Sequence, residues 1–324
     1  MSYIYILISL FFLEVSYFYI AKRFNITDKP NSRSSHDSIT LRGGGVIFYF
    51  GSLLFFILSN FSYPWFFLGL TLATLISFFD DIFNLSSKIR LSVQLLSVLL
   101  LLFQLDVITL PWYYLIIIFV IVLGIINAYN FMDGINGITV CYSLAVGALL
   151  VFINNRFHFI DQDYLYFSML SLFVFAFFNF RNKAKAFAGD VGSVSIAFIL
   201  LFALGTLIVK SGTLIYVLFL SVYGIDAVWT IVRRLYLQEN IFDPHRSHLY
   251  QYLANEAGVN RLIISFLYGA LQFLIGLLVI FIAGFSIHLQ IVLSVILLII
   301  LSAIYLVVKS FVLRKYVLQT SKNL

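Results

Sequence analysis

Long apolar segments follow one another from end to end of this 324-residue chain. Overall, 62% of the residues are hydrophobic and only 10% are charged, whereas a soluble domain has about 45–50% apolar and about 25% charged residues. A chain of this composition cannot cover itself with polar surface in water. The segments therefore indicate a membrane protein, because a helix needs about 20 apolar residues to cross the hydrocarbon core.

The apolar segments are continuous rather than alternating, which favours transmembrane helices over the strands of a closed barrel. We expect an all-α polytopic membrane protein with eleven spans, or ten if two neighbouring segments form one helix. No block of soluble size separates them, which predicts a single membrane domain over residues 1–324. The predicted spans are Tyr3–Ile20, Gly44–Ser59, Pro64–Phe79, Leu91–Leu105, Trp112–Asn127, Ile138–Ile153, Tyr164–Phe180, Val191–Val209, Thr213–Val232, Leu262–Gly284 and Ile287–Val312.

The basic residues are distributed unevenly between the loops on the two sides of these spans. If the N-terminus lies outside, only Arg156 and Lys210 of the 20 Lys and Arg residues fall outside as well. Cytoplasmic loops carry an excess of Lys and Arg, so we expect the N-terminus outside and the C-terminus inside. The formal net charge of +6 follows from this topology and needs no nucleic-acid partner.

The polar, motif-like stretches also fall in the loops that are expected inside. A transporter more often carries its polar groups near the bilayer midplane. Polar groups gathered on one side favour a membrane enzyme that meets a soluble substrate at the cytoplasmic surface. These stretches are Asp28–Gly45, Asp80–Arg90, Asn127–Gly137, Arg181–Ser193 and Glu239–Asn260.

Two adjacent carboxylates, Asp80 and Asp81, follow the third predicted span. Charged groups beside hydrocarbon are costly and usually pair or serve a function. Carboxylate oxygens suit Mg²⁺, which typically takes one or two carboxylates together with substrate phosphates. An ordinary helix end at the membrane interface is the alternative, although acidic groups are disfavoured at a helix C-terminus.

The stretch Asn127–Gly137 follows the fifth span and includes Asn130, Asp133 and Asn136 among its short polar side chains. Amides and one carboxylate can coordinate a metal and hydrogen-bond a sugar or a base. A turn between helices is the alternative, because these residue types are common in turns. The stretch has almost no flexible filler, which favours function.

Two later loops carry groups that suit an anion. Gly189-Asp190 precedes the eighth span and is equally well explained as an N-cap or as an anion site. In the longest inside loop, His245 and His248 flank Arg246. His and Arg are good phosphate partners, whereas a zinc site would need Cys or acidic companions at matching spacing. This loop therefore predicts phosphate contact.

Two remaining features are a glycine run before the second span and a charge inside the ninth. Gly43 and Gly44 follow Arg42 and can bring backbone amides near phosphates. Asp226 is expected to have a structural role, pairing within the protein with Arg233 seven residues later.

Together, these blocks resemble the polyprenyl-phosphate N-acetylhexosamine-1-phosphate transferase superfamily, glycosyltransferase family 4. They appear in the family's order and at family-like spacing, and they cover nearly the whole chain. The resemblance implies a helix bundle with a cytoplasmic active-site cleft, in a bacterial inner membrane. The matching pieces are Asn31–His36, Arg42–Gly45, Asp80-Asp81, Lys88-Ile-Arg90-Leu with Gln94, Asn127–Gly137, Gly189–Ser193 and His245–Gln251.

The resemblance also implies a role for each matching position. Asn130 and Asp190 would hold a catalytic Mg²⁺, or Mn²⁺ in its place. Asp80 and Asp81 would activate the lipid phosphate or organise the metal. The positions expected at the substrates are Asp133 and Asn136 near the nucleoside, with Asn136 at uracil, and Lys88, Gly43, Gly44, His245, Arg246 and His248 around the phosphates.

The implied reaction transfers a sugar phosphate from a UDP-N-acetylhexosamine to undecaprenyl phosphate, releases UMP and primes a surface glycan. The pentapeptide-translocase branch has consecutive histidines where this chain has His245-Arg246-Ser247-His248, and Asp where Asn136 stands. The chain is therefore more similar to the branch that primes O-antigen, capsule or related glycans. Lys183-Ala184 stands where the family frequently has Pro-Ala, which leaves the sugar contacts of that loop open. The sequence also leaves open whether the protein forms a homodimer.

Three alternatives to this function would each require a different sequence pattern. An intramembrane prenyltransferase needs a second aspartate-rich cluster, which the sequence lacks. A transporter of lipid-linked sugars should bury polar groups in mid-membrane. A catalytically inactive scaffold is disfavoured because the chain retains Asp80, Asp81, Asn130, Asp133 and Asp190.

Overall fold

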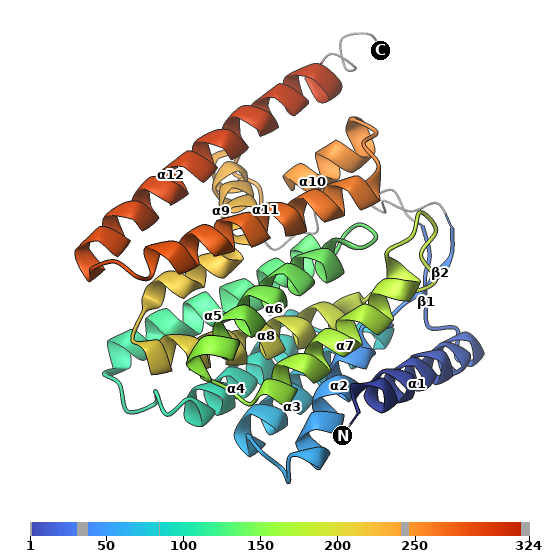
Figure 1. Ribbon diagram of the computed structural model, residues 1–324. Helices are drawn as coiled ribbons and strands as arrows, with labels where there is room; N and C mark the ends of the chain where they lie inside the picture. The colour runs from blue at the N-terminus through green and yellow to red at the C-terminus, as the bar shows by residue number, and fades with distance from the viewer. Residues whose placement is uncertain (1, 31–37, 84, 241–245, 319–324) are drawn as a thin grey trace.

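The computed structural model describes residues 2–30, 38–83, 85–240 and 246–318, and within them the chain is a bundle of helices with one small hairpin (Figure 1). The expected all-α polytopic membrane fold is confirmed. The longer helices are α1 (Tyr3–Arg23), α2 (Val46–Leu58), α3 (Pro64–Phe83), α4 (Ser87–Gln104), α5 (Trp112–Met132), α6 (Ile138–Phe157), α7 (Gln162–Asn179), α8 (Gly189–Ser211), α9 (Ser221–Tyr236), α11 (Arg261–Ile282) and α12 (Ile287–Val312). The short helical segments are η1 (Leu214–Leu220), α10 (Leu249–Gln251), η2 (Tyr252–Glu256) and η3 (Leu313–Leu318).

Every predicted span coincides with a helix of the bundle, the ninth with η1 and α9 together. In the described part of the chain, nine helices are long and apolar enough to cross a membrane by length and composition. Helix α2 is apolar but has only 13 residues, and α7 is not among the nine. The number of spans, ten or eleven, therefore stays a prediction.

Several helices run past their predicted ends, and two of these extensions carry candidate site residues. Helix α3 was expected to end at Phe79 but continues to Phe83, and α5 was expected to end at Asn127 but continues to Met132. Asp80 and Asp81 thus lie on the last turn of α3, and Asn130 lies on the last turn of α5. Helical geometry, rather than loop flexibility, fixes where these side chains point.

Helix α8 is the centre of the bundle. In its most hydrophobic 18-residue window, 83% of the residues are buried, against 11% for the segment that contains α12. Helices α2, α3, α5 and α6 all contact α8. Because α12 buries so little, most of its apolar surface is available to face lipid, whereas the start of α8 is held firmly inside the protein.

A small antiparallel strand pair in the loop between α1 and α2 contacts the segment before α8. Strand β1 (Thr27–Asp28) pairs antiparallel with β2 (Thr40–Leu41), and Leu41 also bridges in parallel to Ala186. Beyond the bridge, the Gly44 and Gly45 N–H groups donate to the carbonyls of Phe187 at 2.9 Å and Ala188 at 3.1 Å. The strands therefore lie at the same end of the bundle as the start of α8, at the right in Figure 1.

Glycines allow the starts of α2 and α8 to touch. A Cβ atom added to Gly45 would overlap the Cα atom of Gly192 and lie 2.9 Å from the carbonyl oxygen of Ala188. No larger residue fits at Gly45 without moving one of the two helices. This contact brings the loop between α1 and α2 and Asp190, on the first turn of α8, to the same place.

Candidate active site

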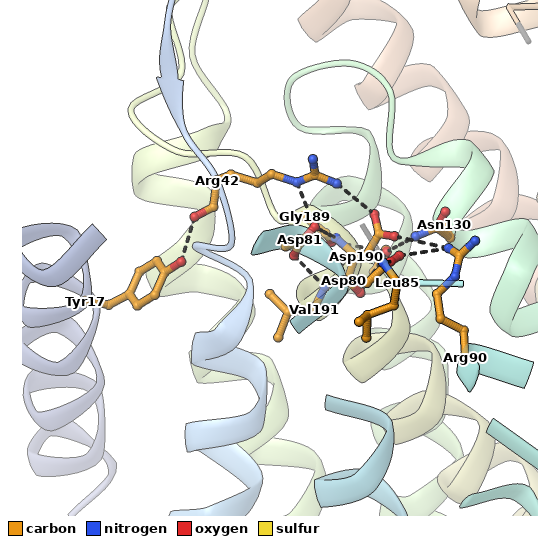
Figure 2. A network of polar contacts seen from close by, with 11 residues as sticks. Tyr17, Arg42, Asp80, Asp81, Leu85, Arg90, Asn130, Gly189, Asp190 and Val191 are labelled. Atoms are coloured by element: carbon orange, nitrogen blue, oxygen red, sulfur yellow. Dashed lines mark hydrogen bonds and ion pairs between the residues drawn. The ribbon is translucent and has the colours of Figure 1, made fainter. Parts of the chain in front are cut away.

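Three aspartates and two arginines meet where α3 ends and α8 begins (Figure 2). Asp80 and Asp81 come from α3 and Asp190 from α8, as the sequence predicted for a shared site. Arg42, from the loop after β2, and Arg90, from α4, approach the carboxylates from opposite sides. The site therefore combines segments that are far apart in the chain.

The Asp81 carboxylate is fully engaged by hydrogen bonds. One oxygen accepts the Asp190 N–H at 3.0 Å and Arg42 Nε at 2.7 Å, and the other accepts the Val191 N–H at 3.0 Å. The side chain has no exposed surface. The first N–H groups of a helix lack partners within that helix and favour a carboxylate. Asp81, which lies on α3, therefore accepts the hydrogen bonds of the first N–H groups of α8.

Gly189 leaves the space that this arrangement needs. Its φ of +72° lies in the left-handed region, and an added Cβ would lie 2.5 Å from Asp81 Oδ2 and 3.0 Å from the Gly43 nitrogen. Only glycine adopts this conformation at little cost. Gly189 thus has a packing role beside Asp81.

Asp80 ties α3 to α4. Its Oδ1 accepts the Leu85 N–H at 2.7 Å, and its Oδ2 accepts Arg90 Nη1 at 2.8 Å. Only 9% of its side-chain surface is exposed. Both oxygens of Asp80 are therefore committed to holding the α3–α4 connection and its arginine.

Asp190 is the most accessible and the most loosely held of the three carboxylates. Its side chain is 24% exposed, and its oxygens lie 3.3 Å from Arg42 Nη2 and 4.0 Å from Arg90 Nη1. Neither arginine was predicted to contact the aspartates, and both belonged only to matching motif pieces. Charge balance was the signal that could have found them, because buried carboxylates need nearby cations.

Asn130 lies beside Asp190 through a shared serine. The Asn130 side-chain amide donates to Ser193 Oγ at 3.2 Å, and Ser193, which is fully buried, hydrogen-bonds the Asp190 carbonyl oxygen at 3.3 Å. The structure therefore brings together the two residues that were expected to hold a metal.

The donor chemistry of this pair fits Mg²⁺ as part of a site. In the described residues, no group of three or more His, Cys, Asp and Glu could hold a metal by itself. Mg²⁺ usually takes one or two protein carboxylates, several waters and substrate phosphates. Asp190 and Asn130 offer hard oxygen ligands of the type that such a partial site needs.

Asp133 and Asn136 follow α5 and are both held by neighbouring segments. Asp133 accepts the Thr139 hydroxyl at 2.5 Å. Although part of its surface is exposed, burial by surrounding protein atoms raises the pKa of Asp133 to about 6, against the lowering effect of the Thr139 hydrogen bond. The buried Asn136 amide donates to the carbonyls of Arg181 at 2.8 Å and Asn182 at 3.3 Å. Asn136 thus anchors the loop before α8.

The residues predicted to contact phosphates in the first two loops, Gly43, Gly44 and Lys88, have different surroundings. The Gly44 N–H already donates to Phe187, so this amide has a partner within the protein. Gly43, with φ +82°, packs against Tyr17, whose hydroxyl donates to the Arg42 carbonyl at 2.6 Å. Lys88 is exposed at the start of α4. A phosphate role for Gly43, Gly44 and Lys88 stays a prediction.

The histidine loop is only partly described. His245 lies outside the described residues. Arg246 contacts Glu256 at 3.4 Å. His248 is buried, with Nδ1 3.3 Å from Asp226 Oδ1. The expected internal pairing of Asp226 is thus found, but with His248 and not with Arg233.

Tyr250 lies in the matching piece His245–Gln251, but the sequence reasoning gave it no role. It is fully buried, and its hydroxyl donates to the Phe131 carbonyl at 2.8 Å. A Cβ on Gly134 would overlap that hydroxyl. The segment after His248 therefore rests directly on the turn that carries Asp133.

Comparisons with known proteins agree with the motifs. Residues 63–209 match the model of glycosyl transferase family 4. The chain is 29% identical over 283 residues to an undecaprenyl-phosphate α-N-acetylglucosaminyl 1-phosphate transferase of Thermotoga maritima, covering 82% of this chain and 86% of that protein. The Escherichia coli K12 protein of the same name is 25% identical over 286 residues, covering 79% and 77%. A probable Bacillus subtilis counterpart is 25% identical over 259 residues, covering 72% and 71%.

Proposed function

The chain's resemblance to the polyprenyl-phosphate N-acetylhexosamine-1-phosphate transferase superfamily is confirmed by these matches, and from this premise we propose that it is a priming transferase. It would transfer an N-acetylhexosamine-1-phosphate from a UDP-sugar to undecaprenyl phosphate and release UMP. The observation that carries this proposal is the meeting of Asp80, Asp81 and Asp190 at the start of α8, with Asn130 beside them.

The proposed reaction is a phosphoryl transfer between two anionic substrates. An oxygen of the lipid phosphate attacks the β-phosphorus of the UDP-sugar, the bond from that phosphorus to the bridging oxygen breaks, and UMP leaves. Catalysis of such a step rests mainly on positioning and charge neutralisation. Asp190 and Asn130 would hold Mg²⁺, which when bound neutralises charge on the diphosphate.

The chain's own residues divide into those that hold the site and those that face it. Asp81 accepts three hydrogen bonds and Asp80 two, which supports an organising role for both. A strong general base is not needed, because phosphate monoesters have a second pKa near 6 and are largely ionised at neutral pH. Asp190, the most exposed carboxylate, is the residue best placed to meet substrate.

The setting of the reaction follows from the distribution of charge. The chain is a multi-pass membrane protein, and the excess of basic residues in alternate loops supports an active site on the cytoplasmic face of a bacterial inner membrane. The product would be a lipid-linked sugar that starts an O-antigen, capsule or related glycan. N-acetylglucosamine is the first sugar to test, because the relatives are named for it.

The direct test is UMP release by the purified protein in detergent. The reaction would contain undecaprenyl phosphate and one of several UDP-N-acetylhexosamines, with Mg²⁺ or with a chelator. We expect release that requires the lipid, the metal and one particular donor. Asp190→Asn should abolish it, whereas Asp106→Asn, at an exposed aspartate of the opposite end, should not. Folded wild-type protein that releases no UMP with any donor would overturn the proposal.

A further inference from the structure

A second buried polar cluster lies on α9, apart from the three aspartates, and its centre is Asp226. Only 1% of Asp226 is exposed. Its Oδ1 accepts the Leu249 N–H at 3.1 Å and the Tyr305 hydroxyl at 3.0 Å, and its Oδ2 accepts the Tyr268 hydroxyl at 2.9 Å. His248 Nδ1 lies 3.3 Å from Oδ1. One carboxylate thus joins α9 to α10, α11 and α12.

A cation stands one hydroxyl away from this carboxylate. Lys309 of α12 is 4% exposed, and its ammonium group donates to the Tyr305 hydroxyl at 2.6 Å and to Thr230 Oγ1 at 2.9 Å. Thr230 in turn hydrogen-bonds Asp226 at 3.3 Å. Charged groups within membrane helices are costly and persist only when they are paired and hydrogen-bonded. The cluster is complete in this sense.

The cluster holds a segment that reaches the candidate active site. The Leu249 N–H and the His248 ring are fixed by Asp226, and the His248 N–H is capped by Gln251 at 3.2 Å. Next along the chain, Tyr250 donates to the Phe131 carbonyl and fills the space beside Gly134. Asp226 is therefore connected to the turn after α5 through three consecutive residues.

We propose that Asp226 is a positioning residue, which fixes the His248–Tyr250 segment against the turn that carries Asp133. This inference rests on the proposed function, because Asp133 and Asn136 are the positions that the family resemblance implies near the nucleoside of the donor. Asp226 itself touches no substrate. It acts by holding the His248–Tyr250 segment against that turn, and α12 contributes to this anchor through Tyr305 and Lys309.

The first test needs no enzymatic activity. Diethyl pyrocarbonate acylates accessible imidazoles, and His248 is only 2% exposed. We expect Asp226→Asn to raise the modification rate of His248 by about tenfold or more, as located by peptide mass spectrometry. Without the charged acceptor, the state in which the His248–Tyr250 segment is detached from α9 becomes more populated. His158 of the opposite end gives the reference rate. An unchanged His248 rate in folded Asp226→Asn would overturn the anchoring role.

The second test separates positioning from simple loss of stability. A structural defect lowers the folded fraction, which reduces apparent kcat but leaves both KM values unchanged. If the turn that carries Asp133 is displaced, KM for the UDP-sugar should rise, or kcat of fully folded protein should fall, by roughly tenfold to a hundredfold. KM for undecaprenyl phosphate should not change. A wild-type protein without activity would overturn the proposed function, while the labelling result would still stand or fall by itself.

Single-hydroxyl variants keep the proposal testable if Asp226→Asn does not fold. Tyr305→Phe and Tyr268→Phe each remove one donor to Asp226 and keep the ring that packs there. We expect each to increase His248 labelling by less than the Asp226 change. Tyr113→Phe, at an exposed tyrosine of α5, is the matched control and should have no effect. Labelling that stays at the wild-type rate in both cluster variants would contradict the anchor.

Discussion

The carboxylate of Asp81 accepts the backbone N–H of Asp190, so the residue that organises the candidate site and the residue that faces it are joined directly, at 3.0 Å. The neighbouring Val191 N–H and Arg42 reach the same carboxylate. Asp81 sits where the α8 backbone has no internal hydrogen-bond partners. The Asp81 carboxylate therefore has a structural role first, and it affects turnover by fixing the position of Asp190.

Replacing the two aspartates by alanine should separate these roles. Asp81→Ala leaves two buried N–H groups and Arg42 without their acceptor and should destabilise the protein by about 2–4 kcal/mol. Asp190→Ala removes a partly exposed carboxylate with one hydrogen bond of 3.3 Å and should change stability by less than about 1 kcal/mol. Thermal unfolding in detergent would measure both. Equal losses would contradict the capping role of Asp81.

Metal binding can be followed without turnover. With Mn²⁺ as a paramagnetic probe and UDP to supply phosphates, we expect Asp190→Asn and Asn130→Ala to weaken binding by at least about tenfold, since even loss of an outer-shell contact costs that much. Electron paramagnetic resonance of free Mn²⁺ gives the affinity. Asp106→Asn is the control for changing an acid to an amide. Wild-type affinity in both site variants would place the metal elsewhere.

The acid limb of the activity profile should report Asp133. Because burial raises its pKa to about 6, Asp133 is protonated below that value, and kcat/KM should fall as pH drops through about 6. For stability the sign is opposite: the raised pKa favours the folded state below about pH 4, and this contribution is lost as pH rises through about 6.

Thr139 provides the matched perturbation of that titration. Its hydroxyl lowers the pKa of Asp133 by donating to the carboxylate, so Thr139→Val should move the acid limb to higher pH. Asp133→Asn should remove the limb and leave a lower, flatter profile. A limb that keeps its position in both variants would assign it to another group.

Substitution by alanine should have opposite effects on stability at two glycines, Gly45 just before α2 and Gly124 within α5. Gly45→Ala places a methyl group against the Gly192 backbone and should destabilise by about 1–3 kcal/mol or prevent folding, as overpacking does. Gly124→Ala, in α5, meets nothing within 4 Å and should stabilise by about 0.5–1 kcal/mol, since alanine favours helices. Yield of folded protein and thermal unfolding would show the difference. Tolerance of alanine at Gly45 would argue against the close contact of α2 and α8.

The helical membrane fold could be predicted because hydropathy alone decides it, but the helix ends could not. Hydropathy falls at Asp80, so the third span was expected to end at Phe79. The helix continues because the Asp81 charge is offset by Arg42 and by the amides that begin α8. Those partners come from distant segments, and no local window of sequence contains them.

The candidate site was likewise predictable in its members and not in its contacts. The order of motifs singled out Asp80, Asp81, Asn130 and Asp190, and the structure brings all four together. Asp226 shows the limit. Arg233, the nearest charge in sequence, stands two helical turns away, about 10.5 Å along the axis. The actual partner, His248, belongs to a loop whose return to α9 depends on the whole bundle.

Lys309 determines how far the C-terminal part of the chain can be shortened in protein engineering. Helix α12 is buried so little that it resembles a removable anchor, a natural place to shorten the chain or to attach a fusion partner. Cutting before Ile287 would nevertheless take away both Tyr305 and Lys309, and with them the cation that stands beside Asp226. A shortened protein would leave the buried Asp226 carboxylate with His248, Tyr268 and the Leu249 N–H but without Tyr305 and Lys309, and loss of partners is costly for a buried charge. Fusions should therefore be attached after η3, with α12 left whole.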